Sequence, residues 1–145
     1  MANVFDVNAP ELINRVKDEL KNIPEMQPPE WAKFAKTGVS RRMPPQQEDF
    51  WFIRAASILR QVYVMGKPMG TQRLRTKYGG RQHDRMKPEV FKKGSGSIIR
   101  KILQGLEKSG LIVQKEINGK KGRVMTPKGK SLVDKNAAVI FRAIV

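Results

Sequence analysis

The sequence predicts a mainly α-helical fold in a single domain spanning residues 1–145, and three observations support this prediction. The length of 145 residues is typical of one domain. Residues 50–63 read FWFIRAASILRQVY, and their apolar side chains cover about half of a helix circumference. The flanking segments carry helix start and stop signals, with Pro and Gly between them. We therefore expect the other helices to pack around residues 50–63.

Two helices are expected before this central amphipathic helix. The first follows Asn8, a candidate N-cap residue, and its apolar residues Leu12, Val16 and Leu20 lie one turn apart. The second is short and is expected around residues 31–35. The segment that follows contains Gly, Ser and two consecutive Pro, which is typical of a loop.

Two more helices are expected after the central helix, at residues 71–78 and 97–109. Glycines end both of them. The segment between them, residues 79–96, is rich in Gly, Lys and Arg, so we expect a long, irregular and functional loop. Its apolar residues Val90 and Phe91 would anchor this loop to the core.

A β-hairpin and a last helix are expected at the C-terminal end. Residues 111–117 and 122–126 flank Asn118-Gly119, a strong signal for a two-residue hairpin turn. Thr126-Pro127 then provides a cap residue and a proline at the first helical position.

The order of these elements predicts a winged helix, in which a helix-turn-helix is followed by a β-hairpin wing. Residues 71–78 and 97–109 would form the helix-turn-helix, and residues 111–126 would form the wing. In a DNA-reading protein, the second helix enters the major groove. Here the connection between the two helices is much longer than the usual turn of about 3–4 residues, and it would crowd that groove. A winged-helix DNA-binding transcriptional regulator remains the alternative function.

Charge is the strongest indication of function in this sequence. The chain has 29 Lys and Arg against 13 Asp and Glu, a formal net charge of +16. Residues 1–35 hold six acids and four bases, which leaves a net charge of +18 for residues 36–145. A large and uneven positive charge favours binding to nucleic acid.

Other functional classes fit the sequence poorly. With no Cys and a single His, His83, the chain cannot build a zinc site or a thiol nucleophile. Gly129-Lys130-Ser131 resembles only the end of a P-loop, because Val124 stands where the first glycine is required. We find no apolar run near the ~20 residues of a membrane span and no signal-peptide pattern. We therefore expect no enzymatic activity, no cofactor, no metal and no membrane partner.

Short motifs throughout the chain resemble the S19e family of small-subunit ribosomal proteins. They are Pro29–Trp31, Trp51-Phe52 with Arg54–Ser57, Tyr78–Gln82, Gly94–Ser97 with Arg100-Lys101, and Met125–Gly129. The resemblance implies a helical body with a winged-helix core, a place in the head of the small subunit, rRNA binding and a role in subunit maturation. It also implies a cytoplasmic location in the ribosome, next to other head proteins. The chain stops at Val145 without the basic tail of eukaryotic members, which favours an archaeal type.

The candidate RNA contacts come from several segments, because folded RNA is recognised by shape and its phosphates by scattered cations. The candidates are Arg41, Arg42, Arg54, Arg60, Lys77, Arg81, Gln82, Lys92, Lys93, Ser95, Ser97, Arg100, Lys101, Lys120 and Lys121. Arg54 and Arg60 lie on a narrow polar strip of the central helix, where they either pair with buried carboxylates or reach the RNA. Trp51 and Phe52 are expected in the core, and the free protein is expected to be a monomer.

Overall fold

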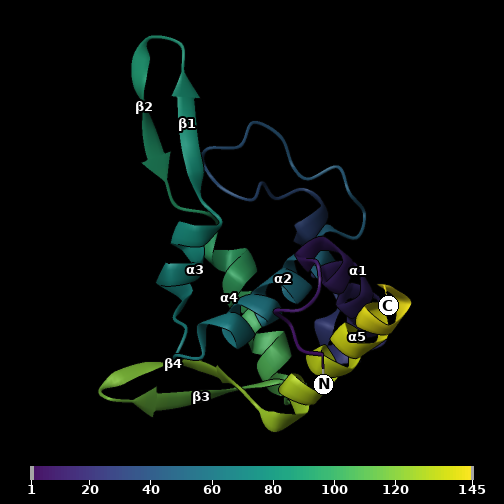
Figure 1. Cartoon of the computed structure of the whole chain (residues 1–145). Coiled ribbons are helices and arrows are strands. Elements are labelled where there is room, and N and C mark those ends of the chain that lie inside the picture. The colour runs from purple at the N-terminus through teal and green to yellow at the C-terminus, as the bar shows by residue number, and fades with distance from the viewer. Residues whose placement is uncertain (1, 145) are drawn as a thin grey trace.

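The structure is a computed structural model, and it describes residues 2–144 of the chain. Within these residues it contains five α-helices, two short 3-10 turns and two antiparallel β-hairpins (Figure 1). This confirms that the fold is mainly helical. The elements are α1 (Ala9–Lys21), the 3-10 turns η1 (Pro24–Met26) and η2 (Glu30–Lys33), α2 (Phe50–Met65), α3 (Thr71–Lys77), β1 (Gly80–Asp84), β2 (Lys87–Lys92), α4 (Gly96–Lys108), β3 (Ile112–Ile117), β4 (Lys120–Met125) and α5 (Pro127–Ile144).

The helix α2 lies at the centre of the molecule, as the sequence predicts. Its residues Ala55, Ile58 and Leu59 are fully buried, and Trp51 is only 5% exposed. The helices α1, α4 and α5 and the strand β4 all contact α2. Because α2 is apolar on most faces, it gains stability only when neighbours on several sides remove it from water.

The hairpin β3–β4 follows its sequence signal closely. Asn118 and Gly119 have φ angles of 52° and 72°, the left-handed values that a type I′ turn requires at both central positions. Partway along β4, Arg123 exchanges two backbone hydrogen bonds of 2.9 and 3.0 Å with Met69. The α2–α3 connection thereby fixes the hairpin to the helical body.

The segment at residues 79–96 differs from the expected irregular loop, because most of it forms the hairpin β1–β2. Arg81 pairs with Phe91 and Gln82 pairs with Val90 across the two strands. Val90 and Phe91 are 55% and 48% exposed, so the expectation that they anchor this segment to the core is wrong. The two strands pair through backbone hydrogen bonds, so the segment forms a hairpin that projects from the body rather than a loop anchored to the core.

The second N-terminal helix is also shorter than expected. The chain forms only the single 3-10 turn η2, and Phe34 beyond it is 79% exposed. Two prolines precede the turn at residues 28 and 29, and a proline supplies no N–H for an α-helical hydrogen bond.

The two hairpins project from the same side of the molecule, at opposite ends, with α3 between them (Figure 1). The loop before α2 lies beside the hairpin β1–β2, whereas α1 and α5 lie on the other side. Gly38 in this loop forms an isolated β-bridge with Gly94, just before α4. The loop, the hairpin and the start of α4 are therefore joined at one place.

Candidate nucleic-acid interface

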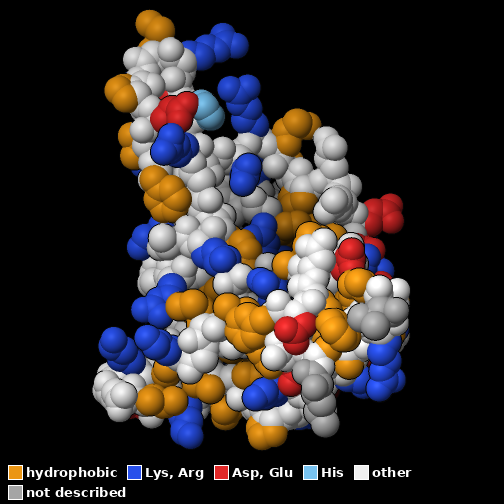
Figure 2. Space-filling view, viewed as in Figure 1, with side chains coloured by type: hydrophobic (Ala, Val, Ile, Leu, Met, Phe, Trp, Pro, Cys, Tyr) orange, Lys and Arg blue, Asp and Glu red, His pale blue; other side chains and the backbone are white. Residues whose placement is uncertain are grey.

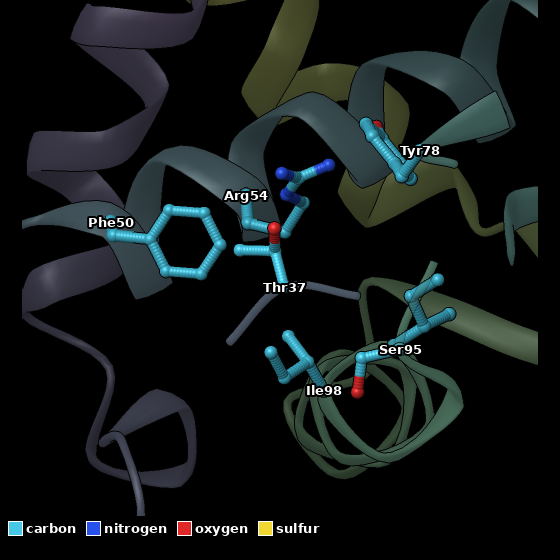
Figure 3. Close-up of a pocket in the computed structure, with 7 residues that line it drawn as sticks. Thr37, Phe50, Arg54, Tyr78, Ser95 and Ile98 are labelled. Carbon is cyan, nitrogen blue, oxygen red and sulfur yellow. The ribbon is translucent and has the colours of Figure 1, made fainter. Parts of the chain in front are cut away.

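Arg54 lies on α2 where the packing opens toward α3 and the start of α4. Its Cζ atom is 4.1 Å from the ring centroid of Tyr78 and 5.2 Å from that of Phe50. Figure 3 shows Phe50 and Arg54 on α2, with the Arg54 side chain directed toward Tyr78. Tyr78 is held in turn by a 2.7 Å hydrogen bond between its hydroxyl and Ser57 Oγ. The guanidinium therefore has a fixed position against two aromatic rings.

The charged form of Arg54 is disfavoured mainly by burial. Burial lowers the pKa of Arg54, Tyr78 opposes this shift, and the nearby charge of Arg41 lowers the pKa further. No carboxylate in residues 2–144 forms an ion pair with Arg54. The alternative in which Arg54 meets a buried carboxylate is therefore not what the described residues show.

Arg60, the second arginine of the polar strip, is half-buried on α2. Its Nε atom is buried and has no hydrogen-bond partner among the described residues. Burial raises the pKa of Tyr78, while the Ser57 hydrogen bond and the charges of Arg54 and Arg60 oppose this shift. The positive charges of both arginines therefore lower the pKa of the same tyrosine.

The start of α4 gathers further arginines around backbone atoms. Arg75 Nε donates a 2.9 Å hydrogen bond to the Gly94 carbonyl, and the Gly94 N–H donates to the Arg75 carbonyl at 2.9 Å. A Cβ placed on Gly96 would lie 2.7 Å from Arg100 Nη1 and 3.2 Å from Arg75 Cδ. Ser95, the N-cap residue, makes no side-chain cap hydrogen bond. The Arg75 and Arg100 side chains thus lie against Gly96 in the first turn of α4, whose N–H groups receive no hydrogen bond from the side chain of Ser95.

The structure brings some predicted residues together and leaves others apart. Arg54 and Ser95 line the same small pocket, Arg41 acts electrostatically on Arg54, and Arg100 lies over the adjoining start of α4. Arg75 belongs to the same cluster but was missed, because a short basic helix gave no reason to single it out. Lys101 lies apart from this cluster, in a groove beside η1 and η2.

The remaining candidates lie on the two hairpins, in the loop before α2, at the end of α3 and near the start of α4. The exposed Arg81 lies 4.0 Å from Glu89, whose other oxygen contacts His83 Nδ1 at 2.7 Å. Lys93 Nζ donates to Gln72 Oε1 at 3.5 Å. The other members of this set are Arg42, Lys77, Lys92, Ser97, Lys120 and Lys121, which are exposed, and Gln82, which is half-buried.

Few of the predicted cations are neutralised within the protein. Of the twelve predicted Lys and Arg residues, only Arg81 lies within 4.0 Å of a carboxylate in residues 2–144. Most ion pairs of the described chain instead join Lys17 and Lys21 to Asp18 and Asp49. Figure 2 shows Lys and Arg side chains along the side that carries the hairpins. This side thus carries a large excess of positive charge.

Fold and surface together define a small, highly basic helical protein with two projecting hairpins. In residues 2–144, no group of three or more His, Cys, Asp or Glu side chains could hold a metal ion. None of the helices in that range combines the length and apolar character needed to cross a membrane.

Comparison with known proteins identifies the family. The family model described as ribosomal protein S19e matches residues 3–143, and the chain belongs to this family. It is 47% identical to the small ribosomal subunit protein eS19 of Aeropyrum pernix, over all of this chain and 94% of the relative. The eS19 proteins of Haloarcula marismortui and Mya arenaria are 45% and 41% identical, over 94% and 95% of this chain and 90% of each relative.

The family assignment made from the sequence motifs is therefore confirmed, with two archaeal proteins at 45–47% identity. Membership in a family of ribosomal proteins also agrees with the expectation that the chain is not an enzyme.

Proposed function

We propose that this protein is a structural constituent of the small ribosomal subunit and binds ribosomal RNA in the head of the subunit. The names of its relatives support a place in the small subunit. The cations without carboxylate partners on the side of the hairpins support RNA binding. The main support for RNA binding is that these cations come from the loop before α2, from α2, α3 and α4, and from both hairpins. A folded RNA offers phosphates at many positions, so it is matched by dispersed cations rather than by one helix.

In this proposal residues 1–145 form a single winged-helix domain. The helices α3 and α4 correspond to the helix-turn-helix, and β3–β4 corresponds to the wing. The hairpin β1–β2 replaces the short turn between the two helices and extends the cationic side. The domain works as a monomer in the cytoplasmic ribosome, supports subunit maturation and contacts neighbouring proteins of the head.

A matched pair of charge-reversal variants tests RNA binding. The first carries Arg81→Glu, Lys92→Glu and Arg100→Glu, all at exposed positions on the cationic side. The control carries the same change of charge on the side of α1 and α5, at residues 15, 135 and 142, which are also exposed. We expect the first variant to lose binding to small-subunit rRNA and incorporation into subunits, and the control to retain most of both.

Two results would contradict this proposal. In the first, both variants enter small subunits as well as the unmodified protein does. In the second, the free protein is a dimer that prefers duplex DNA with two half-sites over rRNA, which is the behaviour of a winged-helix regulator.

A further inference from the structure

A groove runs between α4 and the two 3-10 turns, separate from the arginine cluster at the start of α4. One wall is formed by Lys101, Gln104 and Lys108, which recur on one exposed face of α4. The opposite wall includes Gln27, Pro29 and Trp31. The groove has a volume of about 240 Å³, slightly below the roughly 300–1,000 Å³ that is common for small-ligand sites.

The floor of the groove depends on a glycine in α4. A Cβ placed on Gly105 would lie 2.9 Å from the Glu25 carbonyl oxygen and 3.0 Å from the sulfur of Met26. Because residue 105 has no side chain, η1 packs directly against α4. The chain then continues into η2, where Trp31 stands beside the groove.

Trp31 is exposed enough to accept a stacked base and is held in a fixed orientation. Its exposure is 36%, whereas Trp51 next to it is 5% exposed. The two rings form an edge-to-face pair with centroids 6.1 Å apart and an interplanar angle of 84°. Stacking on an ordered ring avoids much of the entropy cost of fixing a mobile one.

We propose that this groove binds one unpaired nucleotide of RNA, with its base stacked on Trp31 and its phosphate held by Lys101 and Lys108. The two ammonium groups complement a phosphate, and the amides of Gln27 and Gln104 suit the mixed donors and acceptors of a base edge. Glu25 also lines the groove, and its carboxylate fits N–H groups of the base rather than the phosphate. This assignment rests on the proposed function, since it names a nucleotide within the RNA that the protein binds.

The test uses the full chain and a single-stranded hexamer of adenosine ribonucleotides as the probe. Binding is measured by quenching of tryptophan fluorescence and by anisotropy of a labelled hexamer at several salt concentrations. Trp31→Ala is expected to weaken hexamer binding by roughly 5- to 100-fold, the range for loss of one aromatic stacking platform. The salt dependence should stay the same, because no cation is removed. Trp31→Phe should restore part of the affinity.

Two further variants keep the test decisive. Lys108→Glu, at an exposed position, should weaken hexamer binding and reduce its salt dependence, even if Trp31→Ala does not fold. Lys135→Ala on α5, at an exposed position that does not line the groove, is the control, and it should leave the quenching by the hexamer unchanged.

The inference is overturned if the hexamer causes no quenching, or if it binds the Trp31→Ala and Lys108→Glu variants as well as the unmodified protein. It is also overturned if the hexamer never binds while Trp31→Ala abolishes incorporation into subunits. The groove would then be a binding site for a neighbouring protein and not for a nucleotide. In each case binding of the unmodified chain to small-subunit rRNA would leave the proposed function intact. Failure of the unmodified chain to bind that rRNA would reject the proposed function itself.

Discussion

Replacement of Arg54 by methionine separates a structural role of this residue from a role in RNA binding. The two ring contacts of the guanidinium are worth about 0.5–2 kcal/mol each, the range between exposed and desolvated sites. Against them stand burial of the charge and the repulsion from Arg41, which both lower the pKa of Arg54. Methionine keeps an apolar stem against Phe50 and Tyr78 and can form sulfur–aromatic contacts of about 0.3–1.5 kcal/mol.

These opposing contributions nearly cancel, so Arg54→Met should change the free energy of unfolding by less than about 1 kcal/mol, which is a shift of less than about 4 °C in melting temperature. Binding to small-subunit rRNA should weaken by about 10- to 100-fold, the value of one charge-assisted hydrogen bond. The slope of log Kobs against log salt should become shallower by about 0.7–0.9, which corresponds to one lost phosphate contact.

The assays are urea unfolding and RNA binding at several salt concentrations, with Arg54→Lys as the control. Lysine keeps the charge but loses the planar contact with the rings, so the slope should be retained. A loss of more than about 3 kcal/mol in the free energy of unfolding for Arg54→Met, together with an unchanged salt slope, would refute an RNA contact. Arg54 would then be a structural residue only.

Three further predictions concern other parts of the fold and surface. Burial first, and then the 2.7 Å hydrogen bond to Asp134, raises the pKa of Tyr63 to about 12. At pH 7 the hydroxyl is protonated in both states, and Tyr63→Phe should destabilise the fold by about 1 kcal/mol because it removes this hydrogen bond. Between about pH 10 and 12 the folded state keeps a proton that the unfolded state releases. The difference from the unmodified protein should disappear between about pH 10 and 12, and a constant difference in urea unfolding would reject this role. Thr126 Oγ1 accepts a 3.2 Å hydrogen bond from the Gly129 N–H in the first turn of α5, so Thr126→Ala should cost about 1 kcal/mol in thermal unfolding and Thr126→Ser much less. Lys120→Ala should leave the free energy of unfolding within about 0.5 kcal/mol of the original value and reduce the salt slope of rRNA binding by about 0.7–0.9; an unchanged slope would remove the β3–β4 tip from the interface.

The parts of the fold that the sequence predicts well are those with local signals. Asn118-Gly119 requires left-handed backbone at two successive positions, and Thr126-Pro127 combines a side-chain acceptor with a fixed φ angle. The central position of α2 is also predicted, because its apolar residues cover about half of the helix circumference and are stable only when they are buried.

The hairpin β1–β2 has no such signal. Its turn joins Asp84 to Lys87 and contains neither Gly nor Asn-Gly. All of β2 is exposed, so no alternation of buried and exposed residues marks it as a strand. Pairing with a neighbouring strand is a tertiary property, and composition alone suggested a loop.

The candidate site shows the same division between composition and geometry. The number of cations and the segments that carry them could be predicted from the sequence. The stacking of Arg54 on Tyr78 could not, because these residues come from different elements and meet only when α3 packs near α2. The same holds for Trp31, whose exposure depends on the close contact between η1 and Gly105.

The separation of paired and unpaired charges has a thermodynamic consequence for the free protein. Lys17 and Lys21 are neutralised by Asp18 and Asp49 at the junction of α1 and α2, whereas most of the predicted cations have no carboxylate partner in the described residues. Their mutual repulsion destabilises the compact free state, and the apolar core around α2 must offset it. A polyanion bound to the folded state removes this repulsion and adds stability in proportion to RT ln(1 + [L]/Kd). Folding and binding are therefore linked through the same unpaired charges, so the protein gains most stability from the partner that places phosphates along the whole cationic side.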